Sequence, residues 1–156
     1  MSERLTRLAE RIRQDVAELG HVVERTRGAW QRTFESGDDY YLDSVALNLH
    51  GFYSGLERIF ELIASVIDLS LPRGVNWHSL LLDQMAAEVR GVRPAVVSME
   101  TVAALEEYRG FRHIVRNVYA FRVDQARVET LVAGLPLTFS RLQAELEAFA
   151  GFLLKA

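Results

Sequence analysis

Apolar residues recur at steps of three and four along most of this chain, and this spacing restricts its fold more than any other feature. In residues 3–35 the recurring apolar positions are Leu5, Leu8, Ile12, Val16, Leu19, Val22 and Val23. In residues 40–68 they are Val45, Leu49, Phe52, Leu56, Ile59, Phe60, Ile63 and Ile67. Such steps place side chains on one face of an α-helix, so both segments are predicted to be long amphipathic helices.

Turn and capping residues divide the rest of the chain into shorter helical segments. The predicted helices cover residues 3–35, 40–68, 77–89, 98–123, 125–133 and 137–154. Asn76, Ser98 and Asp124 are suited to cap the third, fourth and fifth of these helices. Gly134 is predicted to end the fifth helix, and Pro136 fits the first turn of the last one. No segment shows the pattern of a strand, so we expect an all-α, up-and-down bundle of about five to six helices.

Length and composition fit one soluble globular domain over residues 1–156, with 49% hydrophobic and 25% charged residues. The net charge of −3 predicts no general attraction to nucleic acid, so such binding requires a local basic patch. The absence of cysteine excludes disulfides and thiolate metal sites and fits a reducing cytoplasm. No apolar run approaches the ~20 residues that span a bilayer, and the start of the chain lacks an apolar signal core. We therefore expect a cytoplasmic protein without a membrane partner.

Residues 108–121 carry most of the chemistry in this sequence. Their apolar members share one side of a helix and are predicted to be buried: Phe111, Ile114, Val115, Val118 and Phe121. The opposite side carries Arg109, Arg112, His113 and Arg116, with Asn117 and Tyr119 beside them. No Asp or Glu occurs between Tyr108 and Val123 to neutralise them. Guanidinium groups match phosphate oxygens in pairs of hydrogen bonds, so this face is a candidate anion site. The alternative is a solvated charged face, because 17 of the 18 cationic residues are arginine.

No other motif predicts a metal or a cofactor. The histidines are scattered, without the spacing of a metal site: His21, His50, His78 and His113. The chain has no glycine-rich phosphate loop and no nucleophile motif. His78 is interpreted as a surface histidine because no ligand-type residue accompanies it. Glu57 and Arg58 can reach the interior or an interface, but such charged neighbours are more often surface or structural groups.

Four blocks of the sequence resemble the HepT-like branch of the HEPN family, small all-helical toxins encoded beside a minimal nucleotidyltransferase. These blocks are residues 40–44 (YYLDS), 47–60 (LNLHGFYSGLERIF), 76–78 (NWH) and 111–119 (FRHIVRNVY). The resemblance extends from about Asp38 to Phe152. It implies a HEPN-like helical bundle that dimerises. It also implies a cleft between the subunits, where an Arg-x4-His-x-Tyr motif cuts RNA without metal. In some members of the family, the partner nucleotidyltransferase silences the toxin by modifying the tyrosine of this motif.

Within this motif, Arg112 and Tyr119 take the arginine and tyrosine positions, and Asn117 takes the histidine position. Asparagine can hydrogen-bond a phosphate or a ribose, but it cannot move a proton near neutral pH as histidine does. His113 lies one helical turn before Asn117 and can substitute as acid or base. In that case Arg112 and Arg116 would stabilise the charge of the phosphorane.

The resemblance implies the toxin-side protein of a toxin–antitoxin pair, acting as a metal-independent endoribonuclease or as an RNA-binding protein with weakened catalysis. Arg109, Arg112 and Arg116 would contact RNA, and Tyr119 would be the position of regulatory modification. The implied partners are RNA, a second copy of the chain and a cognate nucleotidyltransferase-type antitoxin. The alternative is a non-enzymatic helical interaction module whose Arg-rich face docks an acidic partner or nucleic acid, and Asn117 is the feature that favours it.

Overall fold

The computed structural model describes residues 2–117 and 124–156, apart from the side chains of His113, Ile114, Arg116 and Asn117. Its helices are α1 (Glu3–Ser36), α2 (Asp39–Ile63), the π-helical η1 (Ala64–Asp68), α3 (Trp77–Ala86), α4 (Met99–Asn117) and α5 (Gln125–Lys155). This described part contains no strand, only an isolated bridge between Val89 and Arg93. The predicted all-α class is therefore confirmed. None of the helices described is both long and apolar enough to cross a membrane.

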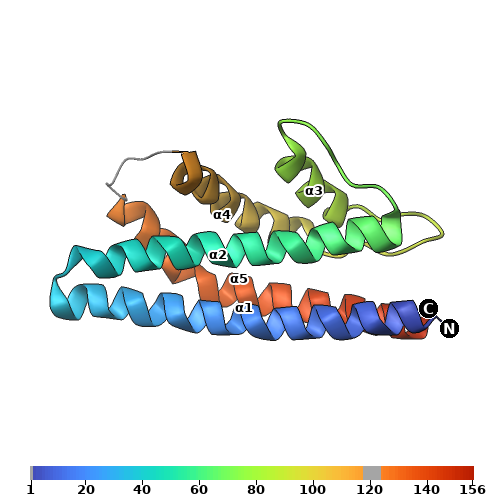
Figure 1. Ribbon diagram of the computed structural model, residues 1–156, viewed down its shortest axis with the longest axis horizontal. Helices are drawn as coiled ribbons and strands as arrows, with labels where there is room; N and C mark the ends of the chain where they lie inside the picture. Colours follow the sequence, from blue (N-terminus) through green and yellow to red (C-terminus); the bar gives the residue numbers. More distant parts are fainter. Residues whose placement is uncertain (1, 118–123) are drawn as a thin grey trace.

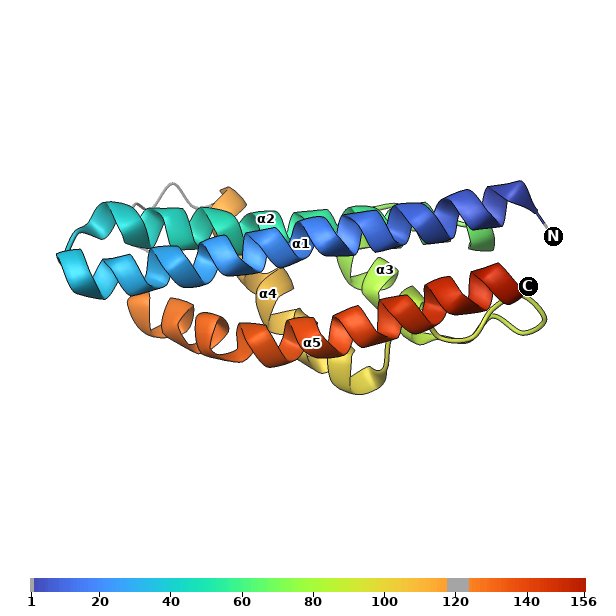
Figure 2. The same ribbon diagram turned by 90° about the horizontal axis from the view of Figure 1, so that it is seen from below.

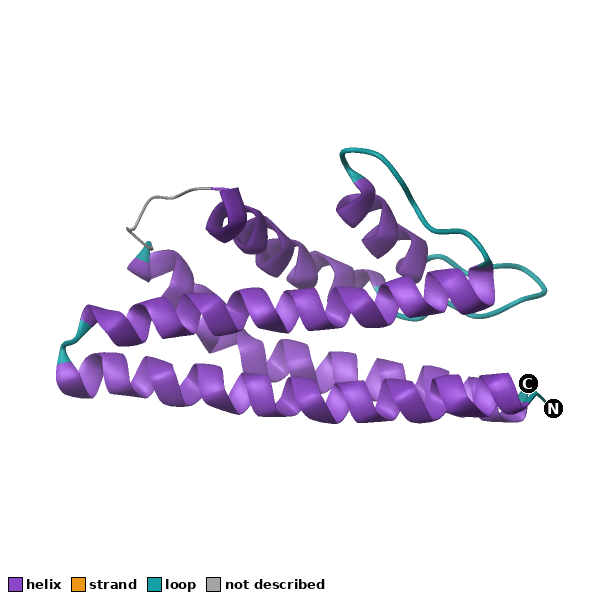
Figure 3. Ribbon diagram, in the orientation of Figure 1, coloured by secondary structure: helices purple, strands orange, loops and turns teal. Residues whose placement is uncertain are grey.

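The long helices α1 and α2 form an antiparallel hairpin, and α5 runs beside α1 (Figures 1 and 2). The turn of the hairpin depends on Gly37, whose φ of 66° is the left-handed conformation that glycine adopts without strain. Asp38 then begins α2 by accepting a hydrogen bond from the Tyr40 amide at 2.9 Å. The shorter helices α3 and α4 lie on the side of α2 away from α1 (Figure 1). Long loops join α2 to α3 and α3 to α4 (Figure 3).

The core is centred on α2, which packs against α1, α3 and α4. The apolar stripe predicted for residues 40–68 is fully buried over most of its length: Val45, Leu49, Phe52, Leu56, Ile59, Phe60 and Ile63. The stripe of α1 is buried at Leu8, Ile12, Val16, Leu19 and Val23. The two helices approach closely at Gly55, where an added Cβ would lie 2.9 Å from Leu19 Cδ2. A larger residue at position 55 would therefore have to displace the Leu19 side chain.

The predicted break between residues 133 and 137 is wrong, because α5 is one continuous helix that contains both Gly134 and Pro136. Proline has no N–H to donate to the carbonyl of Val132, which weakens the helix locally. However, the residues on both sides of Pro136 share one buried face that packs on α1 and α4. Their burial outweighs one missing hydrogen bond. Asp124 caps α5 as predicted, by accepting hydrogen bonds from the amides of residues 126 and 127.

The capping predictions for α3 and α4 have different outcomes. Ser98 caps α4 as predicted, because its Oγ accepts a hydrogen bond from the Thr101 amide at 3.2 Å. The Asn76 prediction is wrong, since its side chain makes no capping hydrogen bond to α3. Helix α3 also ends at Ala86, before the predicted residue 89, because Ala87 is already extended.

Candidate functional site

A buried carboxylate, that of Glu57, lies where α2, α3 and α4 meet. Its side chain is 4% exposed, although Arg58 beside it points to solvent. Glu57 Oε2 lies 2.6 Å from His78 Nδ1 on α3, and Oε1 lies 3.7 Å from Arg112 Nη2 on α4. A buried carboxylate is costly unless it is paired, so Glu57 holds an imidazole and a guanidinium beside it. We call Ser54, Glu57, His78 and Arg112 the polar cluster.

Arg112 faces α2 and is held at two points. Its Nε donates a hydrogen bond to Ser54 Oγ at 2.9 Å, while Nη2 lies near Glu57. The side chain is 13% exposed, so it is more accessible than Phe111, which is buried as predicted. A guanidinium fixed in this way loses little conformational freedom when it binds an anion.

His78 does not lie free on the surface, so its interpretation as a surface histidine is wrong. The first turn of α3 places its side chain, 21% exposed, against Glu57. The Trp77 ring stacks on the imidazole, with the ring centroids 3.6 Å apart. Among the described residues, none forms a hydrogen bond with the second ring nitrogen, Nε2. The hydrogen bond to Glu57 and the stacked Trp77 ring therefore orient the imidazole.

The charges around the cluster are mixed, which corrects the prediction of an uncompensated arginine face. Arg109 donates a hydrogen bond to Glu106 on its own helix at 2.8 Å, and Arg112 has Glu57 as its partner. Burial raises the pKa of Glu61 above its usual value, and the Glu57 carboxylate raises it further. Burial likewise raises the pKa of the Tyr53 phenol well above its ordinary range. Because the Glu57 carboxylate is buried, its charge interactions are stronger than they would be in water.

The other predicted site residues lie at or beyond the end of α4. The backbones of His113, Arg116 and Asn117 belong to the helix, but their side chains lie outside the described residues, as does that of Ile114. The predictions for Tyr119, Val118 and Phe121 fall entirely outside the described residues. Val115 is half-buried and packs against the core.

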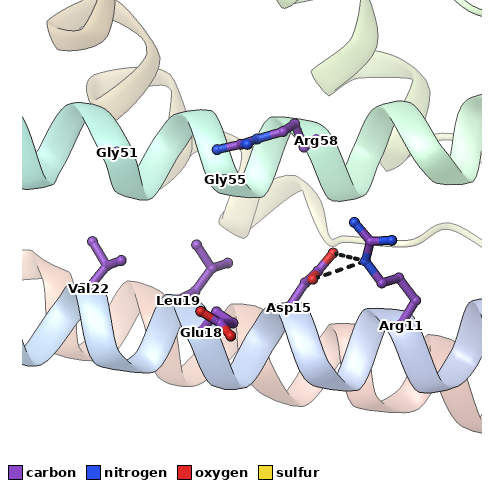
Figure 4. Close-up of a pocket in the computed structure, with 8 residues that line it drawn as sticks. All are labelled: Arg11, Asp15, Glu18, Leu19, Val22, Gly51, Gly55 and Arg58. Atoms are coloured by element: carbon purple, nitrogen blue, oxygen red, sulfur yellow. Dashed lines mark hydrogen bonds and ion pairs between the residues drawn. The ribbon is translucent and has the colours of Figure 1, made fainter.

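An open groove of about 300 Å³ lies elsewhere, between α1 and α2 (Figure 4). Its charged lining consists of Arg11, Asp15, Glu18 and Arg58. Arg11 already pairs with Asp15 at 3.1 Å. The lining thus holds two cations and two carboxylates but no histidine. In the described part of the chain, no three His, Asp or Glu side chains are grouped so that they could hold a metal ion.

The polar cluster is the better candidate, because it combines a fixed cation, a buried carboxylate and an imidazole. The chain matches the family model described as HepT-like protein over residues 44–153. The matched region covers most of the chain and contains every residue of the cluster. No curated protein and no solved structure matches the chain.

Proposed function

Because the chain belongs to the HepT-like branch of the HEPN family, we propose that it is the toxin-side protein of a toxin–antitoxin pair and acts on RNA. The observation that carries this proposal is the placement of Arg112 by Ser54 and Glu57. A guanidinium held in fixed geometry binds phosphate oxygens and stabilises charge that develops on phosphorus. The family supplies the class of substrate, and the fixed Arg112 is the group suited to its phosphate.

In this proposal Arg112 contacts the phosphate at which the RNA is cut. Arg109 and Arg116 add positive charge, and Asn117 orients the substrate by hydrogen bonding. Because Asn117 cannot exchange a proton, cleavage is weak unless another group carries the proton, as His113 would. Tyr119 is the position that a cognate nucleotidyltransferase-type antitoxin would modify.

We also propose that the protein is a cytoplasmic homodimer. A two-fold interface is self-complementary, so a dimer that uses the α4 face brings each Arg112 towards its symmetry mate. Two copies of the polar cluster would then line one RNA-binding cleft. Light scattering should give twice the chain mass of 17.7 kDa, and a monomer at micromolar concentration would contradict this proposal.

The alternative function is a non-enzymatic helical module that docks an acidic partner or a nucleic acid. Asn117 favours it, since the motif position that moves a proton in the family holds an amide here. The two functions differ in whether the protein turns over RNA.

The deciding experiment is the restoration of histidine by Asn117→His. Unless another side chain already carries the proton, metal-free RNA cleavage, measured with a chelator present, should rise ~10²- to 10⁴-fold because general acid–base catalysis is restored. Arg112→Ala in the same background should abolish the gain. RNA binding should weaken as salt rises, because phosphate contacts release counterions.

Arg7→Ala is the matched control, since Arg7 is exposed on α1 away from the polar cluster. It should leave cleavage and most of the RNA affinity unchanged. If neither the wild type nor Asn117→His binds or cuts RNA, the ribonuclease function is refuted and the interaction module stands.

A further inference from the structure

The polar cluster contains an oriented histidine that the family motif does not supply. His78 Nδ1 lies 2.6 Å from Glu57 Oε2, and this carboxylate is buried. An ionised carboxylate only accepts hydrogen bonds, so beside it the neutral imidazole carries its proton on Nδ1 and its lone pair on Nε2. A carboxylate that fixes the tautomer and stabilises the imidazolium is the arrangement by which histidine acts as a general base.

The same carboxylate links this imidazole to the proposed phosphate-binding group. One oxygen of Glu57 faces His78, and the other lies 3.7 Å from Arg112 Nη2. The imidazole and the guanidinium therefore contact different oxygens of one buried carboxylate. Glu61 on α2 is a further acidic neighbour, because burial and the Glu57 carboxylate raise its pKa while His78 and Arg112 oppose that rise.

We propose that His78 is the proton carrier of the RNA-cleaving site and that Glu57 is its positioning residue. This proposal rests on the proposed function and deepens it. With Asn117 at the motif position, cleavage requires a proton carrier from elsewhere in the chain, and α3 supplies one. Another histidine, His21, is exposed on α1 away from the cluster.

The step is an internal transfer within the RNA. His78 Nε2 takes the proton of a ribose 2′-hydroxyl, and the oxygen attacks the adjacent phosphorus. The bond from phosphorus to the 5′ oxygen breaks, and that oxygen takes a proton from water. The products are a 2′,3′-cyclic phosphate and a 5′-hydroxyl, and the imidazolium returns its proton to water. Arg112 stabilises the negative charge on the phosphorane, and Glu57 stabilises the imidazolium.

The test is His78→Asn in the full chain, measured on a short RNA with a chelator present. Asparagine keeps a donor for Glu57 but cannot exchange a proton, so the rate should fall ~10²-fold or more while RNA binding persists. The control His21→Asn should leave the rate unchanged. RNA with a 2′-deoxyribose at the cut site should resist cleavage, because the attacking hydroxyl is missing.

Two further measurements distinguish a catalytic role of His78 from a structural one. For a catalytic base, the wild-type rate rises with pH as the imidazole loses its proton, and Glu57→Gln shifts that rise. Free imidazole should also restore part of the rate to His78→Ala. If His78→Asn lowers the unfolding midpoint, its loss of rate could come from destabilisation. The pH profile of Glu57→Gln and the imidazole rescue of His78→Ala then decide whether His78 is the base.

The outcomes separate this inference from the function on which it rests. If the wild type and His78→Asn cut RNA equally well, His78 is not the proton carrier, but the ribonuclease function stands. The role of His78 is likewise wrong, and the ribonuclease function right, if His113→Asn stops cleavage while His78→Asn does not. The same conclusion follows if Asn117→His cuts RNA and the wild type does not. When no variant binds or cuts RNA, the proposed function itself is wrong.

Discussion

At the scale of single residues, Tyr108 shows how one hydroxyl joins two helices. The ring is buried between α2 and α5, and its hydroxyl donates a hydrogen bond to the Leu131 carbonyl of α5 at 2.6 Å. The Phe52 ring packs against it edge to face, with centroids 5.7 Å apart. Burial raises the pKa of Tyr108 to about 12. Tyr108 therefore stabilises the fold only while its phenol is neutral.

We predict that Tyr108→Phe lowers the free energy of unfolding at pH 7 by about 0.5–1.5 kcal/mol, the usual contribution of one hydrogen bond. The unfolded phenol titrates at about 10, so the contribution of Tyr108 is complete below that pH. It is lost as the pH rises through about 12. Urea unfolding at pH 7 and at pH 11 measures both effects. Between pH 7 and pH 11, the free energy of unfolding should fall more for the wild type than for Tyr108→Phe. An equal fall in the two proteins would contradict the prediction.

The polar cluster shows which residues the sequence identifies and which it does not. Glu57 follows Tyr53 by four positions and precedes Phe60 by three, so helical spacing alone places it on the buried face of α2. Its partners do not follow from any local pattern. Ser54 and Arg112 are 58 residues apart in the chain. Periodicity can show that a charge is buried, but only the tertiary fold shows what neutralises it.

At the scale of elements, Arg93 anchors the loop between α3 and α4. Its side chain is fully buried, and Nε and Nη2 contact the two oxygens of Asp68 on η1 at 2.6 and 2.8 Å. Nη1 donates hydrogen bonds to the carbonyls of Ala87 and Pro94. One guanidinium thus joins the end of η1, the end of α3 and the loop that leads to α4. It thereby fixes α3, which carries His78.

We predict that Arg93→Ala destabilises the protein by about 3–5 kcal/mol, because it leaves the Asp68 carboxylate buried without a partner. Arg93→Lys should also be destabilising, since an ammonium cannot reproduce the fork of hydrogen bonds. Urea unfolding followed by circular dichroism measures the loss. Arg90→Ala, an exposed arginine of the same loop, is the matched control and should have little effect. Equal stabilities of the Arg90 and Arg93 variants would refute this role of Arg93.

The long helices were predictable because their apolar stripes are regular over many turns. Residues 3–35 and 40–68 agree with α1 and with α2 plus η1 to within about a residue at each end. The division of α5 was wrong because Gly134 and Pro136 are local signals for a helix end. Packing of the α5 face on α1 and α4 overrides them. The contacts with α1 join residues that are more than a hundred positions apart, such as Gly20 and Phe139.

At the scale of the whole molecule, α1 raises the question of where the domain begins. The family match starts at residue 44, after α1 has ended. Yet α1 packs along both α2 and α5, and its apolar face is part of the single core. Without α1, the apolar faces of α2 and α5 that it covers would be exposed to water. We therefore propose that residues 1–156 form one domain and that α1 belongs to it.

This proposal predicts one cooperative unfolding transition, observed equally from two distant positions. Trp77→Phe leaves Trp30 of α1 as the only tryptophan, and Trp30→Phe leaves Trp77 of α3. In each variant, tryptophan fluorescence and helical circular dichroism should give the same urea midpoint, because a two-state domain unfolds as a unit. If the Trp30 signal changes at lower urea than the circular dichroism of the same variant, α1 unfolds separately and the single-domain proposal is wrong. Comparing the two signals within one variant removes the effect of the substitution itself on stability.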